Sequence, residues 1–193
     1  SIIDVELGDQ IEMDMSILFS DIRSFTTISE KMTPEENFSF INSYLSRIGP
    51  VIRSYNGIID KYIGDAIMAL FPGNPDDAVK AGLAMLEHLE EYNKEREKSN
   101  DIAIKIGVGI NTGGAMLGTV GEAGRMEGTV ISDAVNLASR IEGLTKTYKT
   151  PLLISEYTLN KLKNPKQYNT RFVDRVNVKG KAEAVSIYEV LDL

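Results

Sequence analysis

Two aspartates, Asp21 and Asp65, each interrupt an apolar run that is typical of a strand, at 15–22 and 63–71. A strand that carries a carboxylate into an apolar setting must satisfy it with hydrogen bonds, a cation or a metal ion. Two such carboxylates side by side repel each other unless a cation lies between them, and oxygen ligands with room left for water and phosphate suit Mg²⁺ or Mn²⁺. The pair therefore predicts a two-metal phosphoryl-transfer site. The alternative is a capping or salt-bridged pair of aspartates.

Two further segments carry groups of interest. Residues 23–26, which include Phe25 and Thr26, leave the first strand and enter a predicted helix, whose free N–H groups can hold a phosphate. The start of a helix that binds no ligand explains residues 23–26 equally well. Asn136 and Arg140 are four residues apart on another predicted helix and share a face that is offset from its apolar stripe. Taken alone, that pair is explained by a surface asparagine and a solvated arginine.

The elements that carry these residues follow from turn residues and apolar periodicity. Thr33, Pro34 and Glu36 predict a helix start with a capping box. Strands at 58–63 and 66–71 place Asp65 at the tip of a hairpin. The other predicted strands are 102–111, 115–120, one that closes at 129–131, 152–154, and two near 171–178 and 186–190, with further helices from 76 or 77, from Ser132 to about 144, and from Ser155. The predicted inward-facing side chains are Phe38, Ile41, Leu45 and Ile48, then Val79, Leu83, Leu86 and Leu89, then Leu137, Ile141 and Leu144.

The order strand, helix, strand, strand, helix, strand matches an α+β fold with a ferredoxin-like βαββαβ core. Extra strands follow at the C-terminal end. The glycine-flanked segment 115–118 predicts either core packing or a protruding hairpin. In this arrangement the end of the first strand approaches the tip of the following hairpin. The fold would therefore bring Asp21 and Asp65 together although they are far apart in the sequence.

Composition bounds the class of protein. The 193 residues suit one domain, and 42% hydrophobic with 25% charged content is typical of a soluble globular protein. The net charge of -7 argues against nucleic-acid binding. The absence of cysteine excludes disulfides and thiolate zinc sites, and the one histidine, His88, lies on a predicted helix surface. No apolar run is long enough to span a membrane, so we expect no direct membrane contact. We expect residues 1–13 to be a linker remnant from an upstream region and 14–193 to form the catalytic domain.

Three segments, in this order, resemble the catalytic domains of class III nucleotidyl cyclases: FSDIRSFT at 19–26, DKYIGDAIM at 60–68 and TVISDAVNLASR at 129–140. The resemblance covers residues 13–191. It implies that Asp21 and Asp65, with the backbone carbonyl of Ile22, ligate two Mg²⁺ (or Mn²⁺) ions. It also implies that Asn136 orients the ribose and that Arg140 stabilises charge on the α-phosphate.

Further implied roles concern the nucleotide itself. Lys61 and Thr129 fall on the two positions that distinguish purines in this family. A lysine can donate to adenine N1 and a threonine hydroxyl can accept from the N6 amine, so the implied substrate is ATP. An exposed Lys61 paired with Asp60 is the alternative. Lys179 matches the lysine that binds the β- and γ-phosphates, and Lys181 competes for that role.

The implied reaction is attack of the ribose 3′-hydroxyl on the α-phosphate, which gives 3′,5′-cyclic AMP and pyrophosphate. The resemblance implies a head-to-tail homodimer with two sites in its interface. No side chain is an evident general base, so we expect the proton to leave to water or to a substrate phosphate. We expect a cytoplasmic domain with an upstream sensor or regulatory domain, in a parent protein that is either soluble or membrane-anchored.

Three alternatives remain open from the sequence. A guanylate cyclase is disfavoured by Lys61 and Thr129. A catalytically silent nucleotide-binding or dimerisation module is disfavoured because every expected site residue is present. A diguanylate cyclase has a related fold, but the chain has no Gly-Gly-Asp-Glu-Phe segment.

Overall fold

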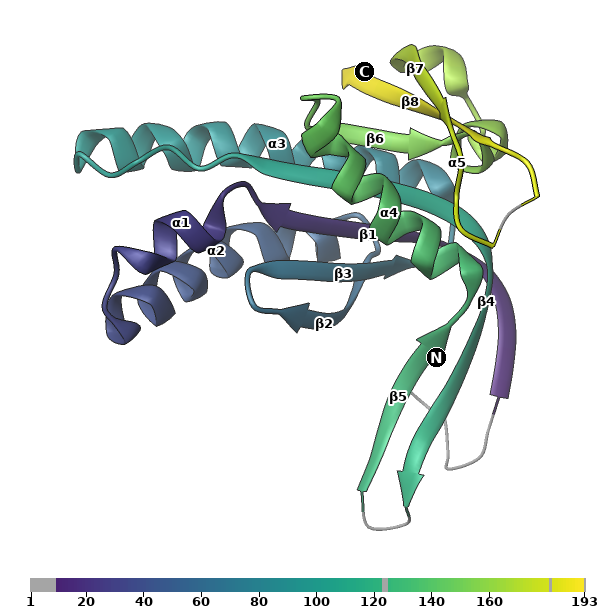
Figure 1. Ribbon diagram of the computed structural model, residues 1–193, viewed down its shortest axis with the longest axis horizontal. Helices are drawn as coiled ribbons and strands as arrows, with labels where there is room; N and C mark the ends of the chain where they lie inside the picture. The colour runs from purple at the N-terminus through teal and green to yellow at the C-terminus, as the bar shows by residue number, and fades with distance from the viewer. Residues whose placement is uncertain (1–9, 123–124, 181, 193) are drawn as a thin grey trace.

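The computed structural model is a twisted sheet with helices on both faces (Figure 1). It describes residues 10–122, 125–180 and 182–192. At 119–122 and 125–131 it describes only the backbone. The strands are β1 (Gln10–Ile22), β2 (Ile58–Ile63), β3 (Ala66–Phe71), β4 (Ile106–Glu122), β5 (Arg125–Ile131), β6 (Leu152–Ser155), β7 (Asn169–Val176) and β8 (Val185–Asp192). The helices are α1 (Phe25–Glu30), α2 (Pro34–Ser54), α3 (Pro75–Lys98), α4 (Asp133–Thr147) and α5 (Glu156–Lys161), with a 3-10 turn, η1, at Pro165–Gln167. Across these described residues, no helix combines the length and the apolar character needed to cross a membrane.

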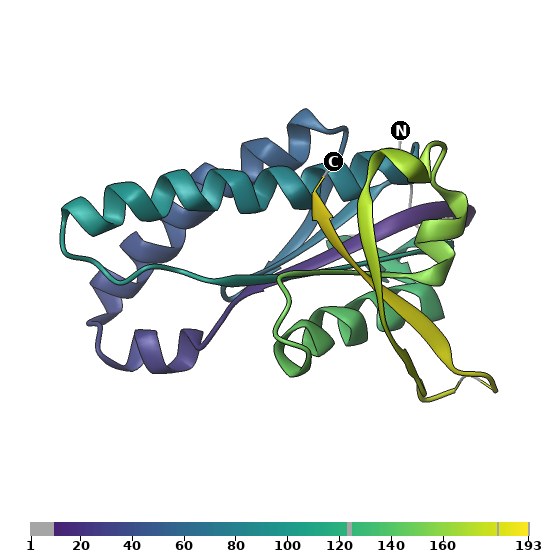
Figure 2. The same ribbon diagram turned by 90° about the horizontal axis from the view of Figure 1, so that it is seen from above.

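The sheet order confirms the predicted α+β fold. Neighbouring strands follow the order β2-β3-β1-β4-β6-β8-β7, and β5 pairs with β4. The first four form the ferredoxin-like core, with α2 and α3 on one face and α4 on the other (Figure 2). β6, β8 and β7 are the extra C-terminal strands. The far part of β4 and β5 project from the body as the predicted hairpin arm (Figure 1).

Helix starts lie where the capping residues predict them. Thr33 and Glu36 form both halves of a capping box, with Glu36 N donating to Thr33 Oγ1 at 3.2 Å and Thr33 N to Glu36 Oε1 at 3.4 Å. The hydroxyls of Ser132 and Ser155 cap α4 and α5. Helix α3 begins at Pro75, one residue before the earlier of its two predicted starts, because the side chain of Asn74 caps it.

The predicted inward face of α2 is wrong in part. Phe38 is 70% exposed, whereas Ile48 is fully buried as predicted. The buried side of α2 is Phe40, Tyr44, Ile48, Gly49, Val51 and Ile52. Tyr44 lies in the middle of this buried face. Because its side chain ends in a hydroxyl group, the pattern of apolar residues at helical spacing did not include it.

The inward face of α3 also differs from the prediction. Val79 and Leu89 are buried, but Leu83 and Leu86 are only partly buried. Small residues fill the contact with the sheet instead, namely Ala78, Ala81, Gly82 and Ala84. Because small side chains let a helix lie close to a sheet, the leucines end up at the margins of the contact. The one histidine, His88, is exposed on this helix, as predicted.

β4 is one continuous strand rather than the two predicted ones. Residues 102–105 lie outside it, and Gly113 and Gly114 remain in the ladder because they pair with Met15 and Asp14 of β1. β1 itself starts at Gln10, opposite Gly118, so 10–13 belong to the sheet. The linker expectation for 1–9 lies outside the described residues. Segment 115–118 combines both alternatives: its alanine and leucine are buried, and the strand continues into the arm.

Glycines on β4 bring α4 close to the sheet. A Cβ added at Gly109 would overlap the backbone nitrogen of Glu142, so only glycine fits there. Gly143, one residue further along α4, has nothing within 4 Å of an added Cβ.

We expect Gly109→Ala to lower the free energy of unfolding by about 1–3 kcal/mol, because the helix backbone must move away from the strand. Urea unfolding followed by circular dichroism measures the change. Gly143→Ala is the matched control, and it should be neutral or stabilising by about 0.5–1 kcal/mol because alanine favours helix. Equal stability of the Gly109 variant and the wild type would contradict the close approach.

Candidate active site

The two aspartates meet at one end of the sheet. Asp21 is the next-to-last residue of β1, and Asp65 lies in the turn between β2 and β3. β3 pairs with β1 in antiparallel fashion, with Ser20 opposite Ile67, so the hairpin tip comes beside the end of β1. Asp65 Oδ2 accepts a hydrogen bond from Ile22 N at 2.8 Å, which ties the tip to the strand end.

Negative charge is concentrated around this pair. Burial raises the pKa of Asp65, the hydrogen bond from Ile22 N lowers it in part, and the charge of Asp21 raises it further. Burial also holds the pKa of Glu142 on α4 well above its usual range, followed in effect by its hydrogen bond to Asp21 and by the charge of Asp21. Arg23 opposes that shift. Because the carboxyl groups of Asp21, Asp65 and Glu142 disfavour one another's ionisation, a bound cation would stabilise them more than a neutral ligand would.

Glu142 is a site neighbour that the sequence reasoning missed. Its Oε1 atom is buried without a hydrogen-bond partner. The only sequence signal is its place two residues after Arg140, on a helix whose core stripe was predicted correctly as Leu137, Ile141 and Leu144. Glu142 lies next to that stripe and faces the sheet, as the overlap with Gly109 shows.

The donor set suits metal ions whose other ligands come from elsewhere. In the described part of the chain, no three acidic or histidine side chains are gathered as a metal-binding group. Two carboxylates and the carbonyl of Ile22 leave several positions of an octahedral Mg²⁺ for phosphate oxygens and water. The residues present therefore fit a divalent ion that binds together with a nucleotide.

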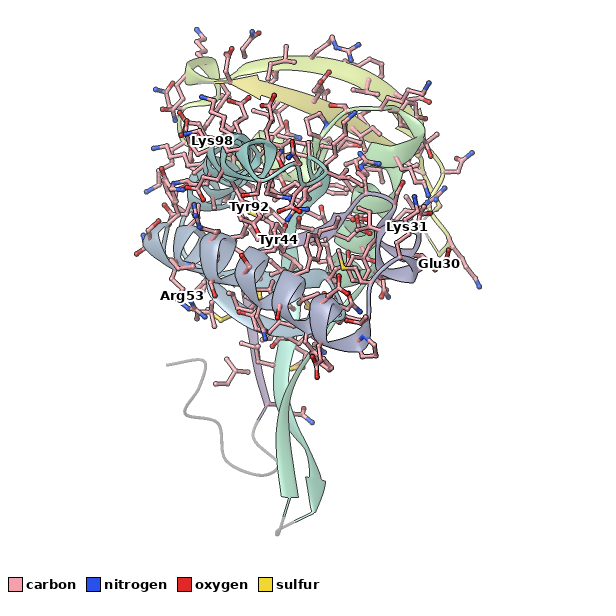
Figure 3. The ribbon with its side chains drawn as sticks, turned by 90° about the vertical axis from the view of Figure 1, so that its left-hand side faces the viewer. Glu30, Lys31, Tyr44, Arg53, Tyr92 and Lys98 are labelled. Atoms are coloured by element: carbon pink, nitrogen blue, oxygen red, sulfur yellow. The ribbon has the colours of Figure 1, made fainter. Side chains whose placement is uncertain are left out.

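α2 forms the wall behind the carboxylates. Burial raises the pKa of the Tyr44 phenol, and the charges of Asp65 and Asp21 raise it further. Tyr44 and Tyr92 lie in the interior between α2 and α3, whereas Arg53 and Lys98 lie at the periphery (Figure 3).

The segment after β1 turns sharply. Ser24 has φ of 55°, in the left-handed region, and α1 follows it. Phe25 is directed into the core, where its ring stacks on Phe40 at 6.2 Å, so only its backbone N–H is suited to a ligand. Thr26 is exposed at the start of α1. Arg23 turns instead toward the connection between α4 and β6, where its Nη2 donates to Thr150 O at 3.3 Å.

The predicted base-reading residues lie on different strands. Lys61 is on β2, half exposed, with its Nζ 3.6 Å from Asp60 Oδ2. This contact is the ion pair that the sequence left as an alternative. Thr129 is on β5, opposite Gly118 of β4, and its side chain lies outside the described atoms. In the order of the sheet, β3, β1 and β4 separate the two strands.

The remaining predicted residues are exposed. Asn136 and Arg140 lie on the outer side of α4. Lys179 lies in the connection between β7 and β8, before Gly180 with φ of 86°, and Lys181 falls outside the described residues. The structure thus brings Asp21, Ile22 and Asp65 together and leaves the phosphate and ribose candidates on open surfaces.

Comparisons with known proteins agree with this fold. The model of the adenylate and guanylate cyclase catalytic domain matches residues 9–191. An adenylate cyclase of Anabaena cylindrica is 48% identical over 96% of this chain and 38% of its own length. A terminal-differentiation-specific adenylate cyclase of Dictyostelium discoideum is 45% identical over 97% of this chain and 9% of its own length.

A solved structure shows the same architecture. The adenylyl cyclase CyaB from P. aeruginosa superimposes with a TM-score of 0.85 at 32% identity, over 96% of this chain and 97% of that one. The chain spans well under half the length of the two curated relatives. From its sheet order, its converging aspartates and these matches, the chain belongs to the adenylate and guanylate cyclase catalytic domain family.

Proposed function

We propose that this domain is an adenylate cyclase, which converts ATP to 3′,5′-cyclic AMP and pyrophosphate. The observation that carries the proposal is the convergence of Asp21 and Asp65, joined through Ile22 N. The names of the relatives at 48% and 45% identity support ATP as the substrate. Because those relatives are longer, we also propose an upstream sensor or regulatory region in the parent protein. We also propose a cytoplasmic location for the domain, where ATP is available as its substrate.

The chain's own groups define the reaction geometry. Asp21, Asp65 and the Ile22 carbonyl would hold two Mg²⁺ or Mn²⁺ ions. Bound there, the ions would polarise the α-phosphate, acidify the 3′-hydroxyl and neutralise the leaving pyrophosphate. The backbone N–H groups of Phe25 and Thr26, at the start of α1, would donate to phosphate oxygens.

A second copy of the chain would complete each site. Glu142 faces Asp21, and Arg140 lies two residues earlier on the same helix, about 200° away around its axis. Arg140 therefore points away from the aspartates of its own chain. A head-to-tail homodimer solves this, because each copy then presents Asn136 and Arg140 to the metal ligands of the other.

The roles of these residues follow from their chemistry. Asn136 would hold the ribose, and the Arg140 guanidinium would stabilise charge on the α-phosphate in the transition state. Lys61 and Thr129 would read the adenine edge, which requires Lys61 to exchange its contact with Asp60 for the base. Lys179 would bind the β- and γ-phosphates, from the exposed connection between β7 and β8.

The base-reading assignment predicts a change of substrate preference. We expect Lys61→Glu with Thr129→Cys to lower kcat/KM for ATP at least about tenfold, because the glutamate repels adenine N1 and nothing accepts from the N6 amine. Steady-state kinetics with ATP and GTP measure the ratio. The control is Lys94→Glu, which reverses the charge of an exposed lysine that pairs with Glu91. This variant should leave the ratio of kcat/KM for ATP to that for GTP unchanged. An unaltered ATP preference in the double variant would remove both residues as base readers.

One assay tests the proposed activity itself. Purified protein is incubated with ATP or with GTP, plus Mn²⁺ or Mg²⁺, and the products are separated by chromatography. Cyclic AMP from ATP is the expected product. Cyclic GMP from GTP alone would establish a guanylate cyclase, and no product with either nucleotide would establish a silent module.

A further inference from the structure

One row of β4 residues faces α4. Alternate residues of a strand lie on the same face, and this row contains three glycines and one asparagine, Asn111. An added Cβ would meet α4 atoms at each glycine: Gly107 at Thr145, Gly109 at Glu142 and Gly113 at Ala134. In this row, Asn111 is therefore the one residue whose side chain extends from the strand toward α4.

Asn111 uses both ends of its amide. The side chain is 2% exposed. Its Nδ2 donates to Ala134 O in the first turn of α4 at 3.0 Å, and its Oδ1 accepts from Ser155 Oγ at 2.6 Å. Ser155 Oγ in turn accepts from Thr158 N at 3.2 Å, as the cap of α5. The start of α4 is therefore bonded through Asn111 to the end of β6.

The same buried polar cluster reaches β1. Thr112 Oγ1 lies 2.9 Å from Thr158 Oγ1 and 2.7 Å from Ser16 Oγ. Ser16 belongs to the strand that ends at Asp21 and Ile22. A continuous set of hydrogen bonds therefore connects the metal-ligand strand to the first turn of α4.

We propose that Asn111 is a positioning residue for catalysis, which fixes where α4 begins and thereby where Asn136 and Arg140 lie. The inference rests on the proposed cyclase activity, since those two residues act on the nucleotide. Ala134 is two residues before Asn136 in the same helix, so a shift of the first turn of α4 would also shift Asn136 and Arg140. A displacement of about 1 Å at a catalytic group can lower a rate by about a hundredfold.

The test variant is Asn111→Asp, which keeps the shape of the side chain and removes the donor. At pH 8 the carboxylate cannot donate to Ala134 O and repels it. We expect kcat to fall about tenfold to a hundredfold, with KM for ATP changed less than about threefold, because the lost positioning acts mainly in the transition state.

The variant also predicts a pH signature. Burial raises the pKa of a carboxyl group, and a protonated Asp at this position donates to Ala134 O again. The ratio of variant to wild-type kcat should therefore rise as pH falls from 8 to 6. The charged groups that face it line an adjoining hollow of about 480 Å³: Asp133 on α4 and Lys161 on α5, together with the phenol of Tyr157. Asp133 raises the pKa of the new carboxyl and Lys161 lowers it.

Ile110→Val is the matched control. Ile110 is fully buried on the opposite face of β4 and belongs to the core cluster under α3. This variant should lose stability without a kcat ratio that depends on pH. The positioning role would be overturned if the ratio of Asn111→Asp kcat to wild-type kcat did not change with pH. It would also be overturned if this ratio matched the one measured for Ile110→Val.

Amide hydrogen exchange supplies a readout that is independent of turnover. In Asn111→Asp at pH 8, the amides of Val135 and Asn136 should exchange faster than in the wild type, whereas in Ile110→Val they should not. If the wild type makes no cyclic nucleotide, the proposed function fails, and the exchange data still decide whether Asn111 holds the start of α4. Unchanged exchange would overturn it.

Discussion

Asp65→Ala is expected to lower metal-dependent turnover of ATP by about a thousandfold or more, the loss that follows when several kcal/mol of metal-derived stabilisation are removed. The alanine removes one carboxylate from the pair that would hold the ions. It also removes the acceptor for Ile22 N, so the hairpin tip loses its tie to β1. Turnover of ATP to cyclic AMP at saturating Mn²⁺ and at saturating Mg²⁺ measures the loss.

A second substitution separates these two effects. Asp65→Asn keeps an oxygen acceptor for Ile22 N and loses only the charge, so its structure should remain and its activity should still be lost. Asp101→Ala, which removes an exposed carboxylate after α3, is the control and should retain wild-type turnover. Substantial metal-dependent turnover in Asp65→Asn would sink the two-metal assignment.

Mixing two inactive variants should restore activity if the site is shared between copies. Asp65→Ala and Arg140→Ala damage opposite halves, so a heterodimer of the two has one intact site and one doubly damaged site. With random exchange of subunits, an equimolar mixture should recover about a quarter of wild-type activity. The assay is cyclic AMP formation after co-refolding, beside each variant alone.

The control mixture combines Asp65→Ala with Asp21→Ala. Both changes damage the same half, so every site in the mixture lacks one metal ligand and activity should stay at background. Size-exclusion chromatography shows whether each variant dimerises. A first mixture that stays inactive, although both variants form dimers, would refute the shared site.

Local signals predicted much of the fold. The capping box at Thr33 and the hairpin around Asp65 are short-range patterns, and both lie where the sequence placed them. Signals that depend on a partner strand were less reliable. Gly113 and Gly114 suggested a break, but β1 pairs with both of them and keeps β4 continuous. Local propensity yields to pairing when a neighbouring strand is present.

The site divides in the same way. The sequence brought Asp21 and Asp65 together through the strand order, and the structure agrees. Glu142 escaped prediction because its importance comes from packing: the missing side chain at Gly109 lets α4 approach until Glu142 meets Asp21. No periodicity in one chain shows such an approach. Phe38 was misplaced for a related reason, since a polar aromatic, Tyr44, occupies the buried stripe.

The opposite faces of α4 have a further consequence. Its inner side, with Glu142, borders Asp21 and Asp65 of its own chain, and its outer side exposes Arg140, which in the proposed dimer would complete the site of the other chain. In such a dimer, a rotation of this one helix would change both centres at the same moment. The two centres would therefore respond to an upstream signal as a single unit, with no state in which one is switched on and its twin is left off.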